Sequence, residues 1–371
     1  MTKTTVELSK EAHYRWNFLQ LCLSLSSYQT KLNMKNRILA FAALLLLFAS
    51  CNNAAHHAEE QKLSEADQQL IATANTYFST LPQPSDPSTP LAQLGKKLYY
   101  DESLSMSGKM SCNTCHPIAN YGVDNEPTSP GHDGTRGTRN SPTTFNAYFH
   151  VAQFWDGRSP DLADQAKGPI LNPIEMGMKS DVDVIEKLKN SADYIQMFQA
   201  AFPNEENPIH FDNFAVAVAE FEGTLATPAA FDAFLDGAVS ALDETQKQGL
   251  SLFIESGCIA CHIGPGLGGN MMQRFGLVHG PYWNYTGSER QDEGKFEVTG
   301  VESDKYVFKS PSLRNIEKTA PYFHDGSVGS LHEAVRIMAY TQLGKELTNE
   351  EIDLMVSFFQ SLTGTIPEHA L

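Results

Sequence analysis

Two short stretches of this 371-residue chain share the pattern Cys-x-x-Cys-His, at residues 112–116 and 258–262. On one helical turn the first, fourth and fifth residues of this pattern share a face, so two sulfurs and one imidazole can hold a single porphyrin. The pattern is the attachment sequence of c-type haem, in which both cysteines form thioethers and the histidine binds the iron. The residues for haem 1 are then Cys112, Cys115 and His116, and those for haem 2 are Cys258, Cys261 and His262.

A zinc site is the alternative interpretation of these cysteines and histidines. Zinc would gather the four sulfurs in one site, and compact zinc modules keep their cysteine pairs close together in the sequence. Here a long stretch of chain separates the two pairs. The spacing therefore favours two covalently bound haems.

The composition indicates an acidic protein with enough apolar residues for packed cores. Lys and Arg together number 27 against 44 Asp and Glu, which gives a formal net charge of -17, and 41% of the residues are hydrophobic. A nucleic-acid binder would carry a basic face, so we expect no nucleic-acid partner. The charge suits a protein that attracts a basic partner electrostatically, and an acidic surface that is merely solvated is the alternative interpretation.

An apolar run at residues 38–49 has the character of a signal peptide. It is shorter than the roughly 20 apolar residues of a membrane-spanning helix. Lys35 and Arg37 supply the positive flank directly after Met34, which makes Met34 the expected true start. Residues 1–33 are then upstream sequence read in frame, with an unusually long leader as the alternative.

The run ends in the sequence Phe-Ala-Ser-Cys at residues 48–51, which resembles the lipobox of bacterial lipoproteins. Phe48 departs from the Leu usual at that position. We expect a signal peptide over 34–51, a lipid anchor on Cys51 and a polar tether over 52–61. Export to the periplasm fits thioether-linked haem, which bacteria assemble outside the cytoplasmic membrane.

The remaining sequence predicts an all-α protein with long loops and a weak internal repeat. Each copy has a helix, a haem motif, a loop region and closing helices. Helices are expected from residue 64 into the seventies and over 91–100, 181–200, 211–224, 244–256 and 349–363. Residues 118–178 look loop-like, and 226–242 look like a connection. We therefore predict two tandem cytochrome c-like domains, over 62–225 and 226–371, each with one covalent haem.

A sixth ligand for haem 2 is sought among methionines downstream of His262, as in cytochromes c. Met338 lies near the end of a predicted helix, whereas Met271 and Met272 follow a glycine-rich turn. Composition and spacing leave Met338 and Met271 about equally good candidates.

From about residue 90 to 363 the chain resembles the bacterial dihaem cytochrome c peroxidases and their relative, the methylamine-utilisation enzyme MauG. The resemblance rests on an ordered set of short matches rather than on one motif. The matching stretches are Gly-Val-Asp at 122–124, Asn-Ser-Pro-Thr at 140–143, Gln-Phe-Trp-Asp-Gly-Arg at 153–158, Glu-Met-Gly at 175–177, Pro-Ser-Leu-Arg-Asn at 311–315 and Thr-Ala-Pro-Tyr-Phe-His-Asp-Gly at 319–326.

The resemblance implies unequal roles for the haems. Haem 1 would be the low-potential peroxidatic centre with His132 as its distal ligand, and haem 2 the high-potential entry point for electrons with Met338 as its axial ligand. A thioether ligand favours Fe(II) and raises the potential, whereas a second His leaves it low. His132 lies between Gly131 and Gly134, in a loop that can release the ligand at low cost.

The resemblance also implies a peroxide pocket and a calcium site. Trp155 would stand between the haems, and Glu175 and Gln165 would line the peroxide pocket. Glu175 has apolar neighbours, a setting that raises a carboxyl pKa and suits an acid–base group. Asn140, with the backbone carbonyls of Thr319 and Pro321, would hold a calcium ion.

The expected activity is reduction of hydrogen peroxide to water with electrons from a small donor cytochrome c or copper protein. The alternatives are a MauG-like oxidase that modifies a partner protein and a plain dihaem electron carrier. MauG-like enzymes carry Tyr in place of the haem 2 Met, and Tyr340 lies near Met338. Family members commonly dimerise, which leaves a homodimer open.

Overall fold

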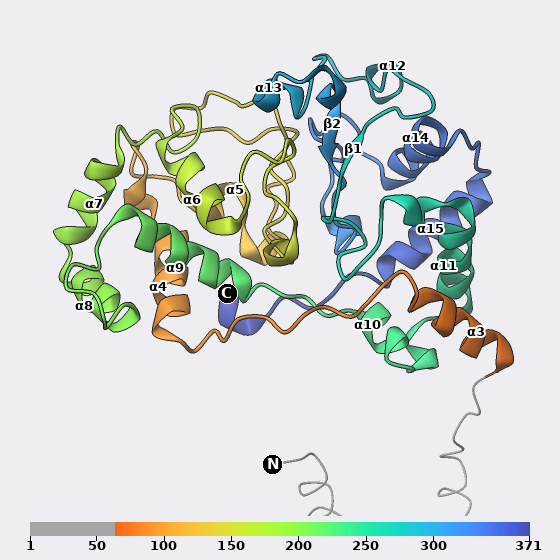
Figure 1. The fold of residues 1–371 in the computed structure, drawn as a ribbon, viewed down its shortest axis with the longest axis horizontal. Coiled ribbons are helices and arrows are strands. Elements are labelled where there is room, and N and C mark those ends of the chain that lie inside the picture. The colour runs from red at the N-terminus through yellow and green to blue at the C-terminus, as the bar shows by residue number, and fades with distance from the viewer. Residues whose placement is uncertain (1–63) are drawn as a thin grey trace, which may run out of the picture. The chain divides into compact units, whose positions relative to one another are not determined.

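The computed structural model describes residues 64–371, and from Glu65 onward they form one unit. The predicted leader, signal peptide and tether lie outside the described residues. The unit consists mainly of helices, as predicted, with one antiparallel pair of short strands (Figure 1). The strands β1 (Met272–Arg274) and β2 (Val307–Lys309) pair with Met272 opposite Lys309. Within residues 64–371 no helix combines the length and apolar character needed to span a bilayer.

One group of helices surrounds the first haem motif. It comprises α4 (Pro90–Tyr100), α5 (Cys112–Cys115), α6 (Leu162–Leu171), α7 (Asp181–Lys189), α8 (Ala192–Ala201) and α9 (Phe211–Gly223). Helix α4 begins sharply because Thr89 accepts a hydrogen bond from the Ala92 N–H and Pro90 occupies the first turn. Helix α9 packs against both α4 and α6, and their apolar faces share one buried core.

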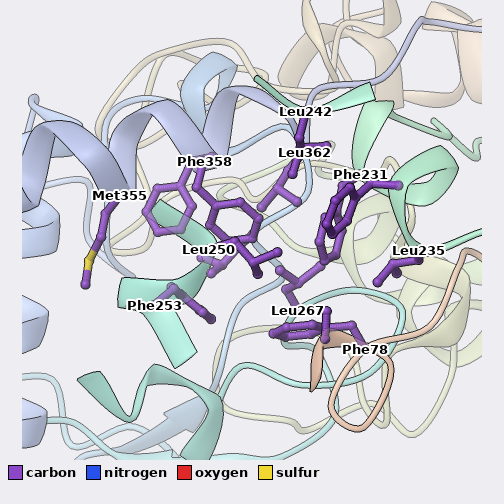
Figure 2. Close-up of a cluster of buried hydrophobic side chains, with 14 of the residues drawn as sticks. Phe78, Phe231, Leu235, Leu242, Leu250, Phe253, Leu267, Met355, Phe358 and Leu362 are labelled. Carbon is purple, nitrogen blue, oxygen red and sulfur yellow. The ribbon is translucent and has the colours of Figure 1, made fainter. Parts of the chain in front are cut away.

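A second group surrounds the second haem motif. It comprises α3 (Glu65–Ala74), α10 (Ala230–Leu235), α11 (Glu244–Ser256), α14 (Leu331–Leu343) and α15 (Asn349–Gln360). The chain between β1 and β2 adds the short helices α12 (Trp283–Thr286) and α13 (Phe296–Thr299). Figure 2 shows its core, in which aromatic rings meet edge to face. The rings include Phe78, Phe231, Phe253 and Phe358.

The two groups repeat one helix contact, which gives the predicted internal repeat a structural basis. A Cβ added at Gly95 of α4 would lie 1.8 Å from the Ala217 oxygen of α9. A Cβ added at Gly249 of α11 would lie 2.0 Å from the Leu354 oxygen of α15. In each group the helix before the haem motif therefore approaches the closing helix so closely that only glycine fits.

Both ends of the described chain cross between the two groups (Figure 1). Helix α3 packs against α10 and α11 of the second group, although it precedes α4 in the sequence. In the other direction, Lys96 donates to the His369 oxygen and Tyr100 to the Ala370 oxygen. The domain boundary between residues 225 and 226 stays a prediction.

Several elements differ from those expected. The helix predicted over 181–200 is two helices, because Asn190 ends α7 and Ser191 caps α8 through the Tyr194 N–H. The loop-like stretch 118–178 contains α6, capped by Asp161. The connection over 226–242 contains α10. The last helix begins at its predicted capping box but ends at Gln360, where tight-turn hydrogen bonds replace the helical ones.

Candidate functional site

The first haem motif presents its histidine in the form that can bind iron. Cys112 and Cys115 lie on the single turn of α5, and His116 ends it. Nδ1 of His116 lies 3.3 Å from the Gly122 backbone oxygen. A carbonyl oxygen only accepts, so Nδ1 carries the hydrogen and Nε2 keeps its lone pair. Burial also lowers the pKa of His116, which favours the neutral imidazole that a metal requires.

The second motif repeats this arrangement with a different local backbone. Gly257 ends α11 in the left-handed region, with φ 91°, and turns the chain into the short helix Cys258–Ala260. Nδ1 of His262 lies 2.9 Å from the Leu267 oxygen, and burial lowers the pKa of this histidine too. Both motif histidines are thus oriented by backbone carbonyls, the partner that fixes the tautomer of metal-bound imidazoles.

The four motif cysteines form no disulfide with one another and are not arranged to share one zinc ion. Burial raises the pKa of Cys112 and Cys258 to about 12 and that of Cys115 to about 11. Among residues 64–371 no three or more His, Cys, Asp or Glu side chains are grouped to hold a metal ion. The sulfurs do not converge on one site.

A cavity of about 240 Å³ opens beside the second motif. Its lining is mostly apolar and includes Cys258, Cys261 and His262. Two histidines in the lining, His150 and His324, each have a buried Nε2 without a hydrogen-bond partner in the described part of the chain. Because a buried polar atom rarely stays unpaired, the cavity is shaped for a largely apolar group with polar edges, as haem is.

Met338 of α14 lines this same cavity together with His262, as expected of an axial ligand. Met271 and Met272 are not among its lining residues. Met272 lies instead beside Gly157, where an added Cβ would come within 3.0 Å of its sulfur. The structure thus places Met338, and neither Met271 nor Met272, in the lining of the cavity that contains His262, and Met338 as the ligand stays a prediction.

His132 and Glu175 lie together beside the first motif. The backbone N–H of His132 donates a 2.8 Å hydrogen bond to the Glu175 oxygen, and the His132 ring lies against Gly177. Glu175 also lies close enough to Cys115 to act on the charge of its thiol. The predicted distal ligand, His132, and one of the two residues predicted for the peroxide pocket, Glu175, are therefore neighbours beside the first haem motif.

The Glu175 carboxyl is held in a half-buried setting. Burial raises its pKa, while the Arg158 charge and a 2.9 Å hydrogen bond from Asn172 Nδ2 oppose the rise. Arg158 lies over the Phe154 ring, 3.4 Å from its centroid. Gln165 is half-buried on α6, whose buried residues Ala166 and Ile170 belong to the same core as Met176.

The three residues predicted to hold calcium line the cavity at the second motif, and so does Trp155. The indole Nε1 of Trp155 donates to the Asn140 oxygen at 2.9 Å. The side-chain amide of Asn140 donates to the Glu126 oxygen, which leaves its Oδ1 as the atom a cation would use. The backbone N–H of Asn140 donates a hydrogen bond to the His324 backbone oxygen. This bond joins Asn140 to the segment 319–324, which contains Thr319 and Pro321.

Several site residues were not predicted from the sequence. They are His150, Lys309 and His324 in the cavity, and Arg139, which binds Asp292 at 2.7 Å and also Asp156. These acids raise the pKa of Arg139 and keep it charged. In the sequence, only the family matches at residues 153–158 and 319–326 indicated this part of the site. The residues that contact one another there are far apart in the sequence, so their pairing has no local signal.

The fold and the two motifs define a mainly helical protein with two c-type haem sites in unlike surroundings. The family model described as di-haem cytochrome c peroxidase matches residues 89–240. The chain is 44% identical over 339 residues to the cytochrome c551 peroxidase of Pseudomonas aeruginosa, covering 90% of this chain and 94% of that one. It is 42% identical to the cytochrome c551 peroxidase of Nitrosomonas europaea, covering 81% and 90%.

The structure agrees with these sequence matches. A crystal structure of a MauG-like protein associated with microbial copper homeostasis superposes with a TM-score of 0.68 at 27% identity, covering 77% of this chain and 95% of that one. This chain belongs to the di-haem cytochrome c peroxidase family, which confirms the predicted resemblance.

Proposed function

We propose that this protein reduces hydrogen peroxide to two waters, with two electrons from a small donor cytochrome c or copper protein and two protons. Electrons enter at haem 2, and peroxide reacts at haem 1. The observation that carries this division is the difference between the two motifs: Met338 lines the cavity of His262, whereas His132 and Glu175 lie together beside Cys115. When bound, the haems supply the iron centres and the electron transfer that break the O–O bond.

Glu175 is the group we assign to proton transfer at haem 1. Cleavage of the O–O bond needs a proton moved from one peroxide oxygen to the other, by a group within hydrogen-bond distance. The Asn172 amide fixes one oxygen, Oε1, of the Glu175 carboxyl. The other oxygen then takes the proton and returns it, and Gln165 completes the pocket as a hydrogen-bond partner of peroxide.

His132 is the group we assign to controlling access at haem 1. Bound to the iron of haem 1, His132 would exclude peroxide, so it would have to move before turnover. Gly131 lets the loop of His132 lie directly on the backbone oxygen of Ile174. A Cβ added at Gly131 would come within 1.6 Å of that oxygen. Since the loop is attached through backbone contacts to the turn that carries Glu175, movement of one affects the other.

Trp155 and a calcium ion are proposed to connect the two centres. Trp155 offers an extended π-system at the wall of the haem 2 cavity, and its hydrogen bond to Asn140 fixes the ring. Calcium would bind Oδ1 of Asn140 and the carbonyl oxygens of Thr319 and Pro321, with waters completing the shell. So few protein ligands imply modest affinity.

The two alternative functions have weaker support. A MauG-like oxidase would place a tyrosine at haem 2, but Tyr340 stacks on His279 at 4.4 Å and is absent from the lining of the cavity in the described structure. A plain electron carrier would have no use for Glu175 and His132 side by side at haem 1.

In the cell we place the enzyme in the periplasm, tethered through a lipid on Cys51, and a homodimer stays open as its assembly. The acidic composition supports a basic electron donor.

The experiment is steady-state turnover of peroxide by purified protein with a reduced small cytochrome c as donor. The expected stoichiometry is two donor molecules oxidised per peroxide. Peroxide consumption without donor oxidation, accompanied by modification of a partner protein, would favour the MauG-like alternative.

A further inference from the structure

Lys309, at the end of β2, is a buried cation without an acidic partner in the described structure. Its side chain is 6% exposed, and Nζ lies 3.0 Å from the Ala152 oxygen and 3.2 Å from Nδ1 of His150. Burial lowers its pKa to about 8, so it remains largely protonated at neutral pH. A buried ammonium is costly unless a counter-charge is supplied.

The nearest carboxylate cannot be that counter-charge. Asp156 is close enough to favour the charged form of Lys309. Its oxygens, however, already accept hydrogen bonds from Arg139 and from Arg158. The ammonium therefore retains one N–H that is not used by Ala152 or His150.

His150 provides a second unused donor. Burial and the charge of Lys309 hold the pKa of His150 well below its usual value, so the ring is neutral. An ammonium only donates, so Nδ1 accepts from Lys309 and the hydrogen resides on Nε2. That Nε2 is buried and has no partner among residues 64–371. Gly269 keeps the ring in place, because a Cβ there would lie 2.2 Å from its Cδ2.

Both unused donors belong to residues that line the cavity shared by His262 and Met338. Because Nδ1 and Nε2 point to opposite sides of the His150 ring, the Lys309 ammonium and the His150 N–H face two separate acceptors, as the two propionate carboxylates of one haem would be. Resting on the proposed function of haem 2, we propose that Lys309 and His150 each bind one of the two propionate carboxylates of this haem and hold its reduction potential high.

The positive charge of Lys309 would act on the reduction potential of haem 2, the same property that the proposed Met338 ligand affects. A cation near the iron stabilises the added electron by Coulomb attraction, and a dry cavity strengthens the effect. Lys309 also donates its backbone N–H to the Trp155 oxygen at 2.7 Å, which joins the pair to the residue assigned between the haems. Lys309 and His150 are thus positioning residues for the electron-entry centre.

The test is spectroelectrochemical titration of haem 2 in Lys309→Met holoprotein. At a fixed applied potential the ratio of reduced to oxidised haem 2 should fall about tenfold, which is 59 mV for a one-electron couple. In Lys309→Arg, which keeps the charge, the ratio of reduced to oxidised haem 2 should stay within threefold of the wild-type ratio. The control Lys305→Met removes the same charge from a side chain paired with Glu293 and Glu302.

A second variant and a second readout distinguish a bound carboxylate from a merely structural lysine. His150→Phe removes the Nε2 donor and should lower the ratio about threefold, even if Lys309→Met fails to retain haem. Redox difference infrared spectra of protein with haem labelled by ¹³C at the propionate carboxyls should show shifted carboxylate bands in both variants.

The outcomes separate this inference from the proposed function. Suppose that the protein binds two haems per chain, and that Lys309→Met and His150→Phe change the haem 2 potential no more than the control Lys305→Met does. That result would overturn this inference and leave the proposed function intact. Unshifted carboxylate bands in both variants would also overturn it. A wild-type chain with fewer than two thioether-bound haems would overturn the proposed function itself.

Discussion

The indole nitrogen of Trp155 donates a 2.9 Å hydrogen bond to the backbone oxygen of Asn140. Asn140 in turn donates its backbone N–H to the His324 oxygen at 2.7 Å. The residue assigned between the haems is thereby connected through one peptide to the residue assigned to calcium. An ion bound at Asn140 would fix the position of that peptide and with it the orientation of the indole ring.

Removal of calcium should therefore slow peroxide turnover several-fold, because Trp155 would lose part of its orientation. Asn140→Ala keeps the backbone bond but removes the amide oxygen, so calcium affinity should fall at least about tenfold. Calorimetric titration of calcium into chelated protein measures this change, with Asn190→Ala at the end of α7 as the control. Unchanged turnover in protein shown by metal analysis to be calcium-free would count against the site.

Met338→His should lower the potential of haem 2, since a second imidazole replaces the thioether that favours Fe(II). We expect a fall of roughly 0.1–0.3 V, within the roughly 0.8 V that axial ligands span. Turnover with a small cytochrome donor should be lost, while the absorption spectrum of haem 1 stays the same. Met272→Leu is the control, because Met272 lies against Gly157 and not in the cavity lining. The reverse pattern would make Met272 the ligand.

Glu175→Gln should leave both haems bound and reducible while slowing peroxide cleavage by roughly 10²–10⁴-fold, the usual contribution of a general acid–base group. The hydrogen bond with Asn172 can persist, so the loss reports proton transfer rather than position. Single-turnover kinetics with peroxide measures it, against Glu186→Gln on α7 as the control. A variant as fast as wild type would show that Glu175 takes no part in proton transfer.

The features that local spacing encodes could be predicted from the sequence. The helix Glu244–Ser256 and the capping box of Thr348 and Glu351 appear where expected, because caps and apolar periodicity act within a few residues. Helix α6 was missed because it contains Gly168 and Pro169, which are poor helix formers. Packing of α6 against α9 compensates for them, and such a contact has no local sequence signal.

The site residues also fall into those that the sequence predicts and those that only the fold brings together. The haem motifs are contiguous, so both were evident at once. Lys309 and His150 lie 159 positions apart, and neither has a neighbour that indicates the pairing. Only the fold brings these two side chains to one cavity, so no reading of spacing could have found them.

Gly249→Ala should lower the thermal midpoint of the second helix group. The added methyl would lie 2.0 Å from the Leu354 oxygen, so α11 and α15 must separate, and such overpacking costs typically about 1–3 kcal/mol. Gly329→Ala is the matched control, because a Cβ there meets nothing within 4 Å. Circular dichroism melts of the holoprotein compare the two, and equal midpoints would show that the helices can adjust.

His132→Gly tests whether His132 closes haem 1 in the oxidised protein. In wild type, one electron delivered to haem 2 should shift the balance of conformations and release the His132 ring from haem 1. The loop has glycines at 131 and 134, the latter at φ 88°, so it can change shape at low cost. The variant has no ring to release, so it should react with peroxide even when fully oxidised.

Low-temperature electron paramagnetic resonance reports the haem 1 spin state, and stopped-flow absorption reports the reaction. An oxidised wild-type haem 1 that already lacks a sixth ligand would refute the gate, and so would a variant whose haem 1 ligation is unchanged.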